Sequence, residues 1–271
     1  MHELLNQILA GNIICRHIIC SDINRDLISI WNMLKDKDER VELYEFYCML
    51  HKQLKERCGY IEGNGLTKED VAKMQTLYYE MRDKYNSMID QNDDSRERTM
   101  IFYWLTRTCF NGLIRYNPKN NHFNSPFHTA FRFGITPDKL KSVFDSWSGV
   151  IDAFTKAGGT IEFLCKSYRD VICDAKEGDV VYMDPPYENS KYMYFCKDIN
   201  ADEFFEILGK MNECNVKWLL SYDGMMNDSD KTSELPIPYK RHEYVYAGTS
   251  SFNRINFNAR DVIKDSLYLN Y

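Results

Sequence analysis

Three apolar runs separated by helical patterns restrict the fold of this chain more than any other feature. They are TIEFLC at 160–165, VVYM at 180–183 and VKWLLSY at 216–222. A short helical pattern separates the first two runs, and the longer pattern NADEFFEILGKMNE separates the last two. Buried strands that alternate with helices are typical of a parallel sheet in an α/β domain. We therefore expect an α/β fold with a largely parallel sheet.

The first part of the chain is mostly helical in pattern. A short β-branched run at 18–20 is followed by Asp22 and by an amphipathic helix. Thr67 and Asp70 have the spacing of a capping pair at the start of a later helix. Further along the chain we expect helices over 41–54, 67–88, from 99 onward and from 136 to about 157.

Two other segments complete the predicted organisation. The helix that begins at 99 runs into a loop rich in Gly, Asn and Pro that ends near 127 and resembles a hairpin. The last residues, 239–271, indicate two edge strands around a polar loop. We therefore expect a core of residues 1–36 and 158–271 and a mostly helical subdomain of residues 37–157 that carries the hairpin loop.

Composition excludes several classes of protein. Hydrophobic residues make up 44% of the 271 residues and charged residues 27%, as in an ordinary globular protein. We expect neither a membrane span nor a signal peptide, because no apolar stretch is long enough and MHELLNQILAGNIIC lacks a basic start and a cleavage site. The nine cysteines form no CxxC pair, which favours reduced thiols in the cytoplasm and no metal site. A net charge of −6 argues against a generally basic surface but not against a local basic face.

Two acids follow predicted strands, at Asp22 and Asp184. Ligands of open α/β sheets bind beyond the carboxyl ends of the strands, so both acids are candidates for a binding site. A carboxylate in the position of Asp22 can accept hydrogen bonds from ribose hydroxyls. An alternative is that Asp22 is the N-cap of the helix that follows it, and the sequence alone leaves both interpretations open.

The stretch VVYMDPPY, which ends at Tyr187, carries more specific chemistry. Pro185 and Pro186 fix φ and lack N–H groups, so the backbone after Asp184 presents rigid acceptors. With the ring of Tyr187, the set suits the amino group and the face of adenine or cytosine. A strand that simply ends in a proline turn explains the prolines, but not the combination of buried strand, acid, prolines and aromatic ring.

These motifs resemble a known family. DPPY after an apolar strand resembles the catalytic signature of amino-methyltransferases that use S-adenosylmethionine. Within that group, RTCFNGLIRYNPKNNHFNSPF at 107–127 resembles the DNA-contacting segment of the Dam-like DNA adenine N6-methyltransferases. FLCKSYRDVI at 163–172 and SDINRDLISIWNML at 21–34 resemble two further segments of that family. The similarity runs from residue 13 to about 223 in the same order.

The resemblance implies a Rossmann-like fold that binds S-adenosyl-L-methionine, with a mostly helical DNA-recognition subdomain. It implies double-stranded DNA as substrate and an adenine flipped out of the duplex. Asp184 and the Pro185 carbonyl would accept the two N6 hydrogens, Pro186 would stiffen the turn, and Tyr187 would stack on the base. Asp22, Ser167 and Tyr168, together with Asp184, would line the cofactor site. The enzyme would work in the cytoplasm of a bacterium or of a phage- or virus-infected cell.

The resemblance also implies a set of DNA-binding residues within the 107–127 segment. Arg107 and Arg115 would meet phosphates or guanine edges, and Asn111 would fill the gap left by the flipped base or pair with the orphaned base. An alternative for each residue is a surface hydrogen bond or an asparagine that stabilises a turn. The residues are Arg107, Asn111, Arg115, Asn117 and Asn124.

One expected element of the family pattern is missing. Family members open with a lysine-bearing segment and a strand followed by FxGxG, whereas the residues before Asp22 contain a single glycine, Gly11. A second protein chain or a homodimer would supply the missing part, or the pocket is built differently, or the chain is a catalytically defective DNA-binding or scaffold subunit. An RNA or protein amino-methyltransferase is a further alternative, but it leaves the 107–127 resemblance unexplained.

Overall fold

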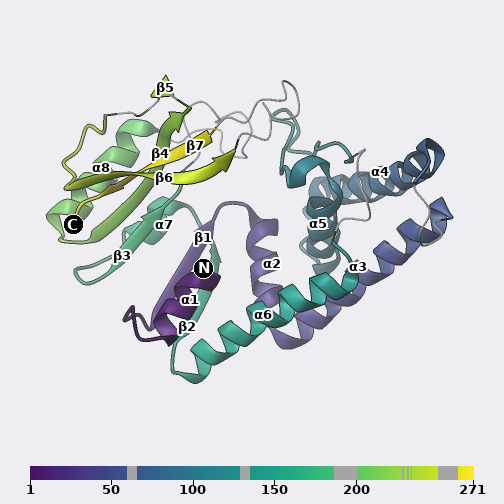
Figure 1. The fold of residues 1–271 in the computed structure, drawn as a ribbon, viewed down its shortest axis with the longest axis horizontal. Coiled ribbons are helices and arrows are strands. Elements are labelled where there is room, and N and C mark those ends of the chain that lie inside the picture. The colour runs from purple at the N-terminus through teal and green to yellow at the C-terminus, as the bar shows by residue number, and fades with distance from the viewer. Residues whose placement is uncertain are drawn as a thin grey trace. The chain divides into compact units, whose positions relative to one another are not determined.

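The computed structural model describes most of the chain, in two compact units (Figure 1). The units are Met1–Ser167 and Tyr168–Tyr271. The described residues are 1–59, 66–128, 135–185, 200–227, 229–230, 232, 234–249 and 262–271. Within these ranges no helix has both the length and the apolar character needed to cross a membrane.

The first unit combines a small parallel sheet with long helices. Strands β1 (His17–Asp22) and β2 (Thr160–Cys165) pair in parallel, with Asp22 opposite Cys165 at their carboxyl ends. Their apolar side chains share a core with residues of the helices that flank them in sequence. These helices are α1 (His2–Leu9), α2 (Arg25–Lys35) and α6 (Pro137–Lys156).

A second core of the first unit surrounds helix α5 (Arg96–Thr108). The sequence TMIFYWLT at 99–106 is apolar on every side, and all eight residues are buried. A helix that is hydrophobic all round must lie inside the protein. It packs against α3 (Lys37–Cys58) and α4 (Lys68–Asp90), and Figure 1 shows α3, α4 and α6 as the long helices of this unit.

Local sequence signals explain where these helices begin. Thr67 and Asp70 form the predicted capping box at the start of α4, in which each side chain bonds the other residue's backbone N–H. Asp36 and Ser95 cap α3 and α5 in the same unit. The predicted helices are confirmed, although α3 extends beyond the expected range of 41–54. Helix α1 was not expected.

The second unit is a mixed sheet. Its strands lie in the order β3-β4-β7-β6, with β5 paired to β4. β3 and β4 are parallel, while β7 is antiparallel to both of its neighbours, β4 and β6. The elements are α7 (Tyr168–Ile172), β3 (Val180–Met183), α8 (Ala201–Glu213), β4 (Lys217–Met226), β5 (Ser229–Asp230), β6 (Arg241–Thr249) and β7 (Val262–Leu269).

The final two strands correct one expectation. Both were predicted to be edge strands, but β7 lies between β4 and β6 and hydrogen bonds on both sides. Ser266 and Tyr268 of β7 are buried at 0% and 1% exposure, as an inner strand requires. The polar loop expected between the two strands lies outside the described residues. The last two strands of the chain, β6 and β7, therefore form an antiparallel part of the sheet.

The two units do not coincide with the expected domains. Because β1 and β2 share a core with α1, α2 and α6, they belong to the same compact unit as the helices. The expected division placed boundaries near residues 36 and 157, whereas the units divide at residue 167. A functional division into a methyltransferase core and a recognition subdomain stays a prediction.

Candidate functional site

The carboxyl end of β1 carries a short turn, residues 22–24, that we call the acid turn. The backbone N–H of Asn24 donates to Oδ1 of Asp22 over 2.6 Å. The side chain of Asn24 caps α2 by accepting from the N–H of Leu27 over 3.1 Å. The helix cap is therefore Asn24, and the alternative that assigned this role to Asp22 is wrong.

Asp22 has the surroundings of a half-buried acceptor. Burial raises the pKa of its carboxyl, and the hydrogen bond from the backbone of Asn24 acts in the opposite direction. Ser167 follows β2 by two residues, and β2 is the parallel neighbour of β1. Asp22 and Ser167 therefore both follow the carboxyl edge of the same sheet, where ligands of α/β folds bind.

Residues 109–127 form a hairpin-like loop, as the sequence predicts, which we call the recognition hairpin. Two antiparallel bridges hold it, Cys109 with Phe127 and Tyr116 with Phe123. The N–H of Phe110 donates to the carbonyl of Pro126 over 2.8 Å, and the two arms therefore stay paired near their base.

Helix α4 supports the returning arm of the hairpin. The side-chain amide of Asn86 donates to the carbonyl of Phe123 over 3.2 Å, and its oxygen accepts from the N–H of Phe123 over 2.8 Å. The hydroxyl of Tyr78 donates to the carbonyl of Ser125 over 2.8 Å. Sequence reasoning missed Asn86. The feature of the sequence that could have identified Asn86 is a polar residue on the buried face of a predicted helix.

The expected DNA-binding residues occupy different places on this loop. Arg115 and Asn124 lie together, because Nε and Nη2 of Arg115 donate to Oδ1 and to the carbonyl of Asn124 over 2.7 and 3.2 Å. Oδ1 of Asn117 accepts from the N–H of Lys119 over 3.0 Å. Asn117 therefore stabilises a turn in this structure, in line with the alternative considered for it.

Asn111 and Arg107 lie near the start of the hairpin and are exposed. Asn111 has a left-handed backbone with φ of 53°, which asparagine tolerates better than most residues. The guanidinium of Arg107 lies 5.3 Å from the centre of the Tyr103 ring. Its charge is therefore held at the surface where α5 ends.

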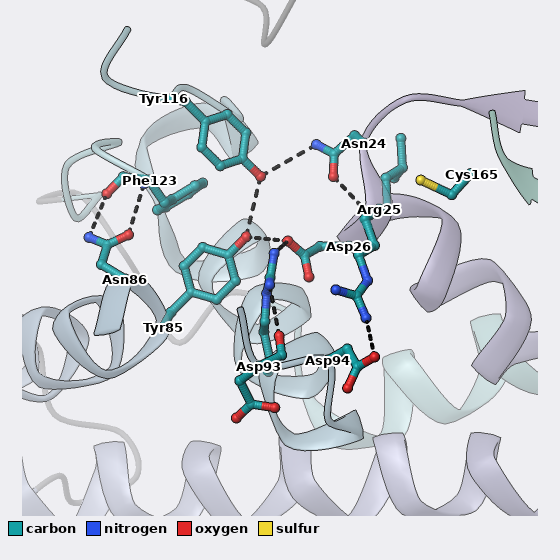
Figure 2. Close-up of polar contacts among 12 residues, drawn as sticks. Asn24, Arg25, Asp26, Tyr85, Asn86, Asp93, Asp94, Tyr116, Phe123 and Cys165 are labelled. Atoms are coloured by element: carbon teal, nitrogen blue, oxygen red, sulfur yellow. Dashed lines mark hydrogen bonds and ion pairs between the residues drawn. The ribbon is translucent and has the colours of Figure 1, made fainter. Parts of the chain in front are cut away.

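A buried polar network lies between the acid turn and the hairpin (Figure 2). Asp26, exposed by only 5%, accepts from Nη2 of Arg98 over 2.7 Å and from the hydroxyl of Tyr85 over 2.6 Å. The hydroxyl of Tyr116 lies 3.4 Å from that of Tyr85 and 3.4 Å from Nδ2 of Asn24. Sequence reasoning missed this network, because its members are far apart along the chain.

Asp184 directly follows β3 in the second unit. Its side chain is exposed, yet the surrounding protein removes enough water to raise the pKa of its carboxyl, and the charge of Asp265 acts in the same direction. Pro185 follows it and is half-buried. Pro186 and Tyr187 lie outside the described residues.

Tyr168 begins helix α7 at the start of the second unit. Its ring packs edge-on against Phe204 of α8, with the ring centres 5.6 Å apart. The guanidinium of Arg169 lies over the Tyr168 ring, 5.0 Å from its centre, and pairs with Glu203 of α8. Tyr168 is therefore anchored between α7 and α8.

In open α/β sheets, ligands bind beyond the carboxyl ends of the strands, and Asp22 and Asp184 each lie at such an end in their own unit. Comparison with known sequences then gives the family. Residues 10–250 match the profile of the D12 class N6 adenine-specific DNA methyltransferases, and the chain belongs to this family.

Individual relatives agree with this assignment. A DNA adenine methylase of Haemophilus influenzae is 30% identical over 170 residues, which cover 62% of this chain and 47% of that protein. The DNA adenine methylase of Serratia marcescens is 27% identical over 169 residues, 62% of this chain and 50% of that protein. The retron Ec67 DNA adenine methylase of Escherichia coli is 25% identical over 158 residues, 58% and 50% respectively. The chain spans about half the length of the curated relatives it matches.

Proposed function

We propose that this chain is a site-specific DNA adenine N6-methyltransferase. It transfers the methyl group of S-adenosyl-L-methionine to N6 of an adenine flipped out of double-stranded DNA. S-adenosyl-L-homocysteine leaves, and N6 loses one of its two hydrogens as a proton. The observation that carries the proposal is the position of Asp184, directly at the end of a parallel strand and before Pro185, in a chain of this family. We place its activity in the cytoplasm of a bacterium or of a phage- or virus-infected cell, because the relatives that it matches are bacterial DNA adenine methylases.

The residues of the acid turn fit the cofactor. Asp22 is half-buried, and a hydrogen bond from Asn24 orients its carboxylate at the carboxyl edge of the sheet. This carboxylate would accept hydrogen bonds from the ribose hydroxyls, and Ser167 and Tyr168 would lie near the adenine of the cofactor. When bound, the cofactor supplies an electrophilic methyl group on a positively charged sulfur.

Asp184 and Pro185 would prepare the base for reaction. The lone pair of adenine N6 is delocalised into the ring, so this nitrogen is a poor nucleophile. When the Asp184 carboxylate and the Pro185 carbonyl accept its two hydrogens, the nitrogen becomes more tetrahedral and its lone pair is freed. Pro186 would keep the turn rigid, and Tyr187 would stack on the flipped base. Catalysis then depends on positioning and electrostatics.

The recognition hairpin would read the DNA. We assign Arg107, Asn111, Arg115, Asn117 and Asn124 to this surface. Arg115 supports the assignment most directly, because its exposed guanidinium is oriented by Asn124 on the same loop. A guanidinium presented in this way suits a phosphate or a guanine edge.

Calorimetric titration of the purified chain tests the proposed function. We expect S-adenosyl-L-methionine to bind with micromolar affinity, and an unmethylated DNA duplex to bind as well. Duplex binding without any heat from the cofactor would contradict a cofactor site that this chain forms alone or as a homodimer. If addition of a second protein chain also fails to produce cofactor binding, the chain is a catalytically defective DNA-binding or scaffold subunit.

Substitution of Arg115 by Ala tests the DNA surface. We expect weaker binding to a mixed-sequence duplex, and a smaller dependence of affinity on salt if the contact is to a phosphate. The matched control is Arg57→Ala, because Arg57 is a surface arginine of the same unit that pairs with Glu80. Equal losses in the two variants would contradict a specific role for Arg115.

We also propose that a second protein chain or a second copy completes the cofactor pocket. Two observations support a further segment beside the strands. Within the described residues, β1 pairs with β2 alone and β3 with β4 alone. Val180 and Tyr182 on one face of β3 are exposed by 58% and 63%. Light scattering with and without cofactor tests whether a second chain or copy is required. A monomer that binds the cofactor with micromolar affinity would contradict this requirement.

A further inference from the structure

The tyrosine network joins the two parts of the proposed site that belong to the first unit. We define it as Asn24, Asp26, Tyr85 and Tyr116, which Figure 2 labels, together with Arg98, which donates to Asp26. One end is the acid turn, because Asn24 contributes its backbone N–H to Asp22 and its side chain to Tyr116. The other end is the recognition hairpin, because Tyr116 is the residue next to Arg115 and forms the bridge to Phe123.

The buried carboxylate fixes the direction of the hydrogen bonds. Asp26 accepts from both Arg98 and Tyr85, so the hydroxyl hydrogen of Tyr85 is committed to Asp26. The contact between the two tyrosines then requires Tyr116 to donate to the oxygen of Tyr85. The oxygen of Tyr116 in turn accepts from Nδ2 of Asn24. Each hydroxyl thus donates one bond and accepts another.

Tyr85 and Tyr116 stay protonated in this environment. Burial raises the pKa of Tyr116 to about 12, and burial raises that of Tyr85 well above the ordinary value. Both hydroxyls therefore keep their hydrogens near neutral pH. The side chains of Arg98 and Asp26 are exposed by only 11% and 7%, so water competes little for their ion pair.

The hydrogen bonds of the network are short at one end and long at the other. The contacts at Asp26 are 2.6 and 2.7 Å long, whereas both contacts at Tyr116 measure 3.4 Å. O–H···O hydrogen bonds are usually 2.5–3.0 Å long and N–H···O hydrogen bonds 2.7–3.2 Å, so both contacts at Tyr116 are longer than usual. Hydrogen bonds at active sites often shorten when the ligands are present.

From these contacts we propose that Tyr116 is a positioning residue that couples the recognition hairpin to the acid turn. When DNA holds the hairpin, the Tyr116 contacts shorten and fix Asn24, which orients the Asp22 carboxylate for the cofactor. Thermodynamic linkage requires the reverse effect, so the bound cofactor favours the DNA-binding position of the hairpin. This inference rests on the proposed function, since it assumes that Asp22 and Arg115 bind cofactor and DNA.

The experiment measures the affinity for S-adenosyl-L-methionine by calorimetry, with and without a saturating, mixed-sequence DNA duplex. For the natural chain we expect the duplex to tighten cofactor binding by about fivefold or more, the lower range of measured couplings. In Tyr116→Phe, which keeps the ring but loses the hydroxyl, we expect this factor to fall toward one. Asn24→Ser should behave alike, because serine still caps α2 but is too short to reach Tyr116.

Tyr79→Phe is the matched control. Tyr79 lies on α4, and its hydroxyl accepts a similarly long hydrogen bond, 3.4 Å, from Gln75, outside the network. We expect its coupling factor to equal that of the natural chain. In the double variant Asn24→Ser with Tyr116→Phe, the coupling should be no smaller than in either single variant. The reason is that both substitutions remove the same contact, between Asn24 and Tyr116.

Each outcome either supports or overturns the inference. Loss of coupling in Tyr116→Phe and Asn24→Ser, with coupling kept in Tyr79→Phe, supports the inference. A natural chain that binds both ligands independently, or a Tyr116→Phe variant that keeps the coupling, overturns the inference and leaves the proposed function intact. A natural chain that binds neither ligand overturns both.

Hydrogen exchange gives a second readout that needs no ligand. In Tyr116→Phe we expect faster exchange at the amides of Asn24, Asp26 and Leu27, since the acid turn loses a support from the hairpin. Unchanged exchange there would contradict a connection between the two segments.

Discussion

At the scale of single residues, the two candidate aspartates differ in what controls their charge. A backbone hydrogen bond from Asn24 orients Asp22 and lowers its pKa, against the larger effect of burial. Asp184 has no such compensation among the causes of its shift, and both burial and the charge of Asp265 raise its pKa. The pKa of each carboxyl is therefore raised, and only at Asp22 does a hydrogen bond oppose the increase.

Asp265→Asn tests the electrostatics of Asp184. The Asp184 carboxyl accepts a hydrogen bond from N6 more strongly when it is ionised. Its raised pKa therefore makes activity decline at a higher pH than an ordinary aspartate would. Removal of the Asp265 charge lowers that pKa. We therefore expect the acidic limb of the rate against pH to move to lower pH. Methyl-transfer rates across the acidic range measure this.

The control for this prediction is Asp230→Asn. Asp230 lies on β5, and its carboxylate accepts from Thr232. It is not among the causes of the Asp184 shift. An acidic limb that stays in place in Asp265→Asn, or that moves equally in both variants, would contradict the electrostatic account.

At the scale of elements, local signals determine what the sequence can predict. The start of α4 was predictable because Thr67 and Asp70 are three residues apart, and α5 because eight consecutive residues are apolar or small. The inner position of β7 was not, since it depends on pairing with β4 and β6 at distant points of the chain. Choosing Asn24 over Asp22 as the helix cap likewise required the geometry of the turn.

The contact between β4 and β7 gives a prediction about stability. Gly224 lies where the register of this pair shifts, and a Cβ there would come within 2.1 Å of the Lys264 carbonyl oxygen and 2.7 Å of the Ser266 nitrogen. We expect Gly224→Ala to destabilise the sheet by about 1–3 kcal/mol, because backbone atoms must move. Hydrogen exchange of β4 and β7 measures the effect.

Gly209→Ala in α8 is the opposite case. A Cβ at Gly209 meets no atom within 4 Å, and alanine is the better helix former by about 1 kcal/mol. We therefore expect a neutral or stabilised protein. Similar destabilisation in Gly209→Ala and Gly224→Ala would show that backbone crowding at β7 is not the cause.

At the scale of the whole molecule, the cores of the two units contain different residues. The clusters around α5 and around β1 and β2 lie in Met1–Ser167, and the cluster around Trp218 lies in Tyr168–Tyr271. The sequence predicted the α/β class, but it did not predict this division. A division into compact units depends on which helices cover β1 and β2, and that is a matter of contacts between distant residues.

Asp26→Ala should destabilise the core of the first unit and leave the core of the second unit unchanged. The substitution leaves Arg98 buried without its partner, and the loss of one member of a buried ion pair typically costs about 3–5 kcal/mol. We expect faster hydrogen exchange in α2, α4 and α5 and little change in β3, β4 and β7. Equal increases throughout the chain would contradict independent cores.

The most direct test of the central claim is mass spectrometry of nucleosides from duplex DNA incubated with S-adenosyl-L-methionine. The natural chain and its Asp184→Ala variant are compared in the presence of any partner that the activity requires. We predict N6-methyladenine with the natural chain and none with Asp184→Ala, while the fold and DNA affinity of the variant stay largely intact. Methylation at the same rate by both proteins would contradict the role of Asp184 and the mechanism built on it.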